Sequence, residues 1–153
     1  SIWNIVVGGL AGSFATLAGS AAVNPIIAPE AIILSVILFL WTPPHFWSLA
    51  MAIGDDYEKA GIPMLPNTLS NSLTTYIILF HTIILVFVTT LLMIYSSSLF
   101  YIFAIFIGGG YFIWTSTLLA IRKTRSAAMN NFFGSFVQLG LLLILIIVDG
   151  III

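Results

Sequence analysis

The sequence predicts an all-α fold, a polytopic bundle of about five helices that cross a lipid bilayer. Hydrophobic residues make up 61% of the 153 residues and charged residues only 6%, against about a quarter in ordinary soluble domains. A soluble fold of this composition would leave large apolar patches in water, whereas lipid accepts them. The length is that of one domain, so residues 1–153 are expected to form a single transmembrane domain.

Five stretches of the chain reach the roughly 20 mainly apolar residues that a spanning helix needs. They are Asn4–Val23, Ala28–Ile53, Leu73–Tyr95, Leu99–Ile121 and Phe132–Ile153. The connection after the first contains Asn24 and Pro25, a pair typical of turns. The polar stretch 54–72 follows the second, serines 96–98 predict a tight turn after the third, and a basic connection beginning at Arg122 precedes the last.

Small residues recur in two of these stretches and predict close helix packing. In the first stretch they recur every four positions, at Gly8, Gly12, Thr16 and Ser20, which would form one stripe. In the fourth stretch, glycines occupy positions 108–110. We expect both features to serve packing between helices.

Basic residues predict the orientation in the membrane. Arg122, Lys123 and Arg125 lie in one short connection, and such connections stay in the cytoplasm. Counting crossings, the stretch 54–72 and the N-terminal end share that side, with Ile153 opposite. The net charge of −1 leaves no basic surface for nucleic acid. The absence of cysteine excludes disulfides, thiolate metal sites and cysteine nucleophiles.

An unusual group of residues lies in the window WTPPHFWSLAMAIGDDYEKAGIPMLP. Pro43 and Pro44 interrupt the second spanning helix, where each removes a backbone donor. Such a break at membrane depth is tolerated where protein or a cavity satisfies the freed carbonyl groups, so we expect it to face the bundle interior. His45 follows directly, and an ionisable residue at this depth is a functional candidate. The alternative is a neutral histidine bound to a helix kink.

The aromatic residues Trp41, Phe46 and Trp47 surround His45 in the sequence. They could line a pocket for a flat or isoprenoid ligand. They could equally form an aromatic belt at the membrane interface, an interpretation that applies to Trp47 above all.

Two adjacent carboxylates, Asp55 and Asp56, come about eleven residues after His45, which is roughly 16 Å along a helix. Mg²⁺ prefers oxygen ligands and often bridges carboxylates to substrate phosphates. Lys59 lies one turn further on and could pair with a phosphate. The alternative is a solvated loop with a local ion pair between Asp56 and Lys59.

The runs WTPPHFWSLA and DDYEKAGIPMLP resemble the haem O synthase family, the protohaem IX farnesyltransferases among the UbiA-type intramembrane prenyltransferases. The segment NIVVGG at the start of the chain is similar to a segment of that family. Residues toward the end of the chain resemble the family's last helix, namely Ala128, Phe132, Ser135, Leu139 and Asp149. The likeness covers most of the chain.

This resemblance implies transfer of a farnesyl group from farnesyl diphosphate to a vinyl group of protohaem IX, which gives haem O for terminal oxidases. It implies Mg²⁺ as cofactor, with haem as substrate. The bilayer and either haem A synthase or oxidase assembly proteins are the further partners implied, with no nucleic acid. The membrane would be the bacterial plasma membrane, or alternatively the mitochondrial inner membrane.

The resemblance also implies roles for individual residues. Asp55 and Asp56 would hold the metal and, with Lys59, form the catalytic set. The residues expected to contact the substrates are Trp41, His45, Phe46 and Tyr57.

The sequence departs from the family pattern in several places. The family has about nine helices, so these five would be its C-terminal part, and the start at Ser1 without Met agrees with a longer protein. The family's first acidic motif, NxxxDxxxD, does not occur. Ala15-Thr16 replaces a Pro-Pro pair, and Gln138 replaces a tyrosine. The alternatives are another UbiA-type aromatic prenyltransferase, a small channel or transporter subunit, and an inactive remnant.

Overall fold

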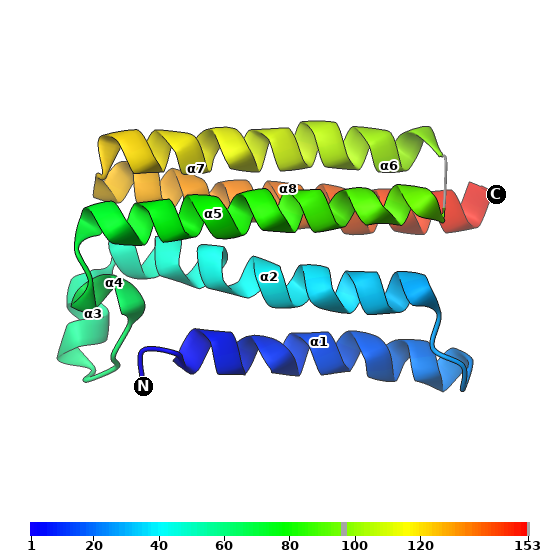
Figure 1. The fold of residues 1–153 in the computed structure, drawn as a ribbon, viewed down its shortest axis with the longest axis horizontal. Coiled ribbons are helices and arrows are strands. Elements are labelled where there is room, and N and C mark those ends of the chain that lie inside the picture. The colour runs from blue at the N-terminus through cyan, green and yellow to red at the C-terminus, as the bar shows by residue number, and fades with distance from the viewer. Residues whose placement is uncertain (96–97, 153) are drawn as a thin grey trace.

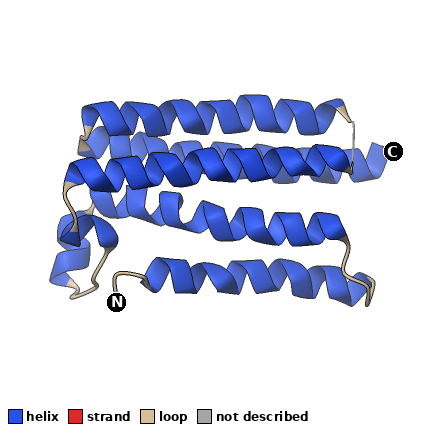
Figure 2. Cartoon of the chain, viewed as in Figure 1, coloured by secondary structure: helices blue, strands red, loops and turns tan. Residues whose placement is uncertain are grey.

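The computed structural model describes residues 1–95 and 98–152, and helices joined by short loops account for this part of the chain (Figure 2). The elements in order are α1 (Asn4–Val23), α2 (Pro29–Ala52), α3 (Gly54–Lys59), α4 (Leu65–Thr68), α5 (Asn71–Thr90), the 3₁₀ helix η1 (Leu91–Ile94), α6 (Leu99–Phe103), the π-helix η2 (Ala104–Gly109), α7 (Gly110–Arg122) and α8 (Arg125–Ile152). Together they form five helices long and apolar enough to cross a membrane. The predicted all-α, multi-pass class is confirmed.

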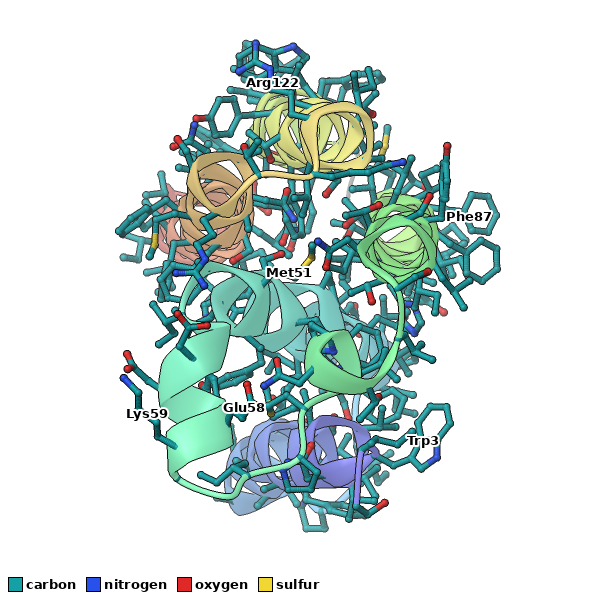
Figure 3. All side chains as sticks on the ribbon, turned by 90° about the vertical axis from the view of Figure 1, so that its left-hand side faces the viewer. Trp3, Met51, Glu58, Lys59, Phe87 and Arg122 are labelled. Atoms are coloured by element: carbon teal, nitrogen blue, oxygen red, sulfur yellow. The ribbon has the colours of Figure 1, made fainter. Side chains whose placement is uncertain are left out.

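The long helices run side by side, and α3 and α4 lie at the same end of the bundle as the N-terminus (Figure 1). Helix α2 packs against α1, α5 and α8, while α7 packs against α5 and α8. Seen from the end that carries α3, α1 and α7 lie at opposite extremes of the bundle (Figure 3). Among the described elements, α1 packs against α2 alone, so most of its surface faces outward.

The last spanning helix begins earlier than the sequence predicted. It starts at Arg125 rather than Phe132, because Ala127, Ala128 and Asn131 are buried against the bundle. The hydroxyl of Thr124 accepts a hydrogen bond from the Ala127 amide at 3.2 Å and caps the new helix. The basic connection is therefore two residues long, and its Lys123 has φ 54°.

The other connections also differ in detail from the expected ones. The polar stretch 54–72 contains the short helices α3 and α4. The tight turn expected at serines 96–98 lies partly outside the described residues, since the structure leaves out residues 96 and 97. Ser98 caps α6, where its hydroxyl accepts from the Phe100 amide at 3.2 Å.

Two of the three glycines of the fourth spanning helix, Gly108 and Gly109, pack closely against neighbouring helices as predicted, whereas nothing lies within 4 Å of a Cβ atom built on Gly110. A Cβ atom on Gly109 would lie 2.8 Å from a methyl group of Val86 on α5. One on Gly108 would lie 3.2 Å from the backbone of Gln138 on α8. Side chains at these two positions would push the helices apart.

Among the described residues, α1 contacts α2 through a face other than the predicted stripe. Nothing lies within 4 Å of a Cβ atom built on Gly8 or Gly12, whereas one on Gly9 would lie 3.2 Å from Thr42. Ser35 donates to the carbonyl oxygen of Ser13 at 3.1 Å, so the contact face is offset by one residue. Small residues follow one another in this helix, and the spacing alone could not select the face.

Helix α2 continues through Pro43 and Pro44, and both prolines are buried. The expected placement of this segment inside the bundle is confirmed. Trp47 is only 1% exposed, so its interpretation as part of an interface belt is wrong. It packs in a core cluster with residues such as Ile78 and Leu119.

A buried polar network joins four helices around Asn131, consisting of Ser48, Thr82, Thr115, Ser116 and Asn131. Thr115 and Ser116 each donate to the Asn131 side-chain oxygen at 2.8 Å. The Asn131 amide donates to the Ser48 hydroxyl at 2.8 Å, and the Thr82 and Ser116 hydroxyls are 2.9 Å apart. The side chains satisfy one another, as buried polar groups in a membrane must.

Candidate functional site

Helix α3 carries the paired aspartates, and an ion pair ties it to the start of α8. Arg125 Nη2 donates to both carboxylate oxygens of Asp55, each at 2.8 Å. The two side chains are 66% and 62% exposed, so the pair is solvated and adds little to stability. The hydrogen bond from Arg125, and then its charge, hold the pKa of the Asp55 carboxyl below its usual value.

A polar cavity of about 180 Å³ opens beside this ion pair at the end of the bundle. Its lining includes the cationic side chains Lys123 and Arg125 and the amides Asn67 and Asn71. Lys123 Nζ donates to the Ser72 hydroxyl at 3.0 Å, and the Asn67 amide donates to the Gly54 carbonyl at 3.1 Å. Two cations and two side-chain amides around one cavity form a site suited to a phosphate-bearing ligand.

The second aspartate faces a different cavity. Asp56 and Tyr57 line a small apolar hollow of about 180 Å³, together with Ile53, Ala60 and Ile62. Asp56 makes no ion pair with a described residue, so the local pair with Lys59 that the sequence allowed does not form.

Lys59, predicted to reach a phosphate, extends from the outer side of α3, away from the other helices (Figure 3). Lys123 and Arg125, which line the polar cavity, are better placed to meet a ligand there.

Whether this site suits Mg²⁺ depends on the donors it offers. Among the described residues, no group of three or more His, Cys, Asp or Glu side chains could hold a metal ion. Mg²⁺ is, however, commonly held by one or two carboxylates with substrate phosphates completing its shell. Asp55, whose partner Arg125 lines the cationic cavity, fits that shared mode, whereas Asp56 lines the separate apolar hollow. The two do not fit a metal site made of protein ligands alone.

An aromatic cluster around His45 forms the second group of predicted site residues. The cluster contains Trp41, His45, Phe46, Phe132 and Phe136. The imidazole ring stacks between Trp41 and Phe132, with ring centroids 4.0 and 4.5 Å away. Phe46 and Phe136 meet it edge to face at 4.9 and 4.7 Å. Phe136 is 49% exposed and His45 is 5% exposed, so the cluster lies just beneath the bundle surface.

Two hydrogen bonds attach this cluster to Ser135 of α8. The His45 Nδ1 atom lies 2.7 Å from the Ser135 hydroxyl. The Trp41 indole N–H donates to the Ser135 carbonyl at 2.9 Å. The two contacting residues of α2 are four positions apart and so share one face of the helix, which turns the WTPPH segment toward α8.

The predicted site residues thus form two separate groups. Trp41, His45 and Phe46 lie within α2, whereas Asp55, Asp56, Tyr57 and Lys59 lie on α3. Ten residues separate His45 from Asp55, which is about 15 Å along a helix. The structure brings Trp41, His45 and Phe46 together. The α3 residues share a helix but face in different directions, and the two groups lie apart.

Sequence reasoning missed the place of Lys123 and Arg125 in the polar cavity. In the sequence, these two residues predict only the orientation of the helices in the membrane. Contact between α3 and residues about seventy positions later is not readable from local spacing. The one available signal was topological, because the expected crossings place both connections on the same side of the membrane.

Comparisons with known proteins agree with the resemblance found in the sequence. Residues 1–137 match the family model described as UbiA prenyltransferase family. The chain is 52% identical over 147 residues to a protein of Paramagnetospirillum magneticum named protoheme IX farnesyltransferase 2, covering 96% of this chain and 51% of that protein.

Two further relatives carry the name protoheme IX farnesyltransferase. The Leptothrix cholodnii protein is 40% identical over 147 residues, and the Coxiella burnetii (strain RSA 331) protein is 40% identical over 148 residues. Each match covers 95% of this chain and 48% of the relative. The chain therefore spans about half the length of the curated relatives it matches. No solved structure matches it.

Proposed function

The chain belongs to the UbiA prenyltransferase family. From this premise we propose that it forms the C-terminal part of a protohaem IX farnesyltransferase. The reaction transfers a farnesyl group from farnesyl diphosphate to a vinyl group of protohaem IX. The observation that carries the proposal is the polar cavity beside Asp55, lined by Lys123 and Arg125 at one end of an apolar bundle. A membrane-dissolved farnesyl chain could present its diphosphate there.

The residues around this cavity would bind and orient the diphosphate. Lys123 is a flexible point charge, and the guanidinium of Arg125 presents a planar fork of donors that matches phosphate oxygens. Asn67 and Asn71 add neutral amide groups at the cavity wall. Arg125 would exchange its present partner, the Asp55 carboxylate, for the substrate.

Asp55 and Asp56 would hold Mg²⁺ in common with the diphosphate. When bound, that ion supplies positive charge against the charge that develops on the leaving group. The two carboxylates are neighbours on the six-residue helix α3, which follows the spanning helix α2. Lys59 belongs to the proposed catalytic set only if α3 rotates toward the cavity.

The aromatic cluster would receive the haem. Trp41, His45 and Phe46 present flat rings on the membrane-embedded part of α2, and Tyr57 lines the hollow beside Asp56. An apolar, water-poor surface protects an allylic cation from early capture by water. In the balanced reaction the C–O bond to diphosphate breaks, a C–C bond to the vinyl group forms, and water supplies a hydroxyl group and releases a proton.

The proposed location is the bacterial plasma membrane, supported by the multi-pass helices and by the bacterial sources of the relatives. Haem A synthase and oxidase assembly proteins remain the predicted protein partners. The second candidate is an enzyme that prenylates a quinone precursor. It would fall under the same family description and would use the same prenyl-diphosphate chemistry. The aromatic cluster around His45 favours the haem substrate.

Ligand binding tests the diphosphate half of the proposal. The chain in lipid nanodiscs should bind farnesyl diphosphate saturably in the presence of Mg²⁺, and inorganic diphosphate should compete. Binding that inorganic diphosphate does not displace would mean that only the farnesyl chain is recognised, and would contradict the assignment of the polar cavity.

A further inference from the structure

The hydrogen bonds of Ser135 determine which nitrogen of His45 carries the proton. The Ser135 hydroxyl lies 2.6 Å from the carbonyl oxygen of Phe132. A carbonyl oxygen can only accept, so the single hydroxyl proton of Ser135 is used in this bond. The contact of 2.7 Å between the hydroxyl and His45 Nδ1 therefore needs its proton from the imidazole. This assigns a proton to Nδ1 from its partners.

The same assignment leaves the other ring nitrogen with a free lone pair. In neutral imidazole one nitrogen donates and the other accepts, so Nε2 of His45 is the acceptor. No described residue donates a hydrogen bond to it. Trp41 and Phe132 cover both ring faces, and Phe46 and Phe136 lie against the ring edge. The Nε2 lone pair lies in the plane of the ring, so a ligand reaches it by displacing an edge ring such as Phe136, which is 49% exposed.

We propose that Ser135 is a positioning residue that holds His45 in the Nδ1–H tautomer and so presents Nε2 as an electron-pair donor to the iron of protohaem. This inference rests on the proposed function, which supplies protohaem as the substrate. It adds the contact between His45 Nε2 and the haem iron. A haem propionate would require a donor N–H at Nε2, which this tautomer lacks. Histidines that ligate metals commonly donate their other N–H to a protein oxygen in this way.

Trp41 strengthens the arrangement from the same face of α2. Its indole N–H holds the Ser135 carbonyl at 2.9 Å, while its ring stacks on the imidazole. The backbone and the hydroxyl of Ser135 are thus fixed by two residues of one helix. The orientation of His45 is set before any ligand arrives.

Nitrogen NMR on the chain labelled with ¹⁵N-histidine tests the tautomer without any substrate. The sequence has only two histidines, so a His81→Gln variant assigns the signals. We expect the parent to show a protonated Nδ1 and an unprotonated Nε2 at His45. In Ser135→Ala the Nε2–H form should appear, while Ser135→Thr, which keeps the hydroxyl, should retain the parent pattern. A protonated Nε2 in the parent would overturn the assignment.

His81 is an internal control in the same samples. Its Nδ1 lies 3.0 Å from the Ile77 carbonyl oxygen on its own helix, so its tautomer does not depend on Ser135. Its signals should be identical in the parent and in Ser135→Ala. A change at both histidines would indicate general disturbance of the fold by the variant, and would count against a specific role of Ser135.

Titration with ferric protohaem IX, followed by the absorption spectrum, tests the iron contact. The parent should give a histidine-ligated spectrum, and Ser135→Ala should bind on the order of 10 to 100-fold more weakly, the usual cost of removing the partner of a ligating histidine. Equal affinity would overturn the positioning role. If the parent shows the predicted tautomer but no ligation by His45, the iron contact fails while the diphosphate half of the proposed function stands on its own test.

Discussion

Arg125 joins Asp55 through two hydrogen bonds of 2.8 Å and so fastens α3 to the first turn of α8. The Lys123 side chain makes a similar link to Ser72, at 3.0 Å. The connection after α2 and the connection after α7 therefore lie at the same end of the bundle (Figure 1). The structure fixes which connections share an end, and the basic residues predict that this end is cytoplasmic.

Cysteine labelling tests this orientation in a background without native cysteine. Single cysteines at Ser70 and Ser126, both exposed, should react with a membrane-impermeant reagent only when the cytoplasmic side is open. Asn24→Cys, in the exposed turn between α1 and α2, is the control and should react from the opposite side. Labelling of positions 70 and 126 from opposite sides would contradict the fold itself.

Asn131 should be the most sensitive member of the buried polar network. Asn131→Ala removes the three hydrogen bonds that its side chain makes with Thr115, Ser116 and Ser48, and should lower the free energy of unfolding by about 1–3 kcal/mol. Its neighbour Asn130 is exposed, so Asn130→Ala is the matched control and should change little. Thermal unfolding in detergent measures both. Equal melting temperatures for the two variants would show that the network does not hold the helices.

The cations of the polar cavity should govern diphosphate affinity. Lys123→Gln and Arg125→Gln each remove a charge from the cavity wall and should weaken farnesyl diphosphate binding about tenfold, the scale of one charge-assisted hydrogen bond. Lys59→Gln removes an equal charge from the outer side of α3 and should have a smaller effect. A larger loss in the Lys59 variant would restore Lys59 as the phosphate partner that the sequence indicated.

His45 should matter for haem and His81 should not. The His81 Nδ1 atom lies 3.0 Å from the Ile77 carbonyl oxygen on its own helix, and its ring lies roughly perpendicular to those of Phe80 and Trp47, whereas His45 lies in the aromatic cluster. His45→Ala should reduce protohaem binding, and His81→Ala should leave it unchanged, as measured by spectral titration. A similar loss in both variants would mean that the cluster is not the haem contact.

The spanning helices could be predicted from the sequence because a run of about 20 apolar residues is long enough, as a helix, to cross the hydrocarbon core of a bilayer. The start of α8 could not. Apart from Met129, residues 126–131 are small or polar, and hydropathy does not register that Ala127, Ala128 and Asn131 are buried against the bundle. Burial by packing between helices follows shape rather than hydropathy.

The candidate site was predictable in its residue types and only partly in its geometry. The WTPPH and DDYEK segments were identified from their chemistry, and the structure places them in two groups. The burial of Trp47 was not predictable, since an aromatic residue near the end of a span is equally typical of an interface belt. The contact between Asp55 and Arg125 depends on helix packing over seventy positions, which spacing does not encode.

The central claim is tested most directly by haem O formation with Asp56 intact and altered. The chain, co-expressed with the part of the Paramagnetospirillum magneticum relative that it does not cover, is supplied with farnesyl diphosphate, protohaem and saturating Mg²⁺. Haem O is then quantified by mass spectrometry, alongside the protein level in the membrane. Asp56→Asn keeps the shape and loses the charge, and the loss of this proposed metal ligand should cost several kcal/mol of transition-state stabilisation. The account predicts haem O from the parent and almost none from Asp56→Asn at an equal protein level. Equal haem O from both, or none from the parent, would contradict it.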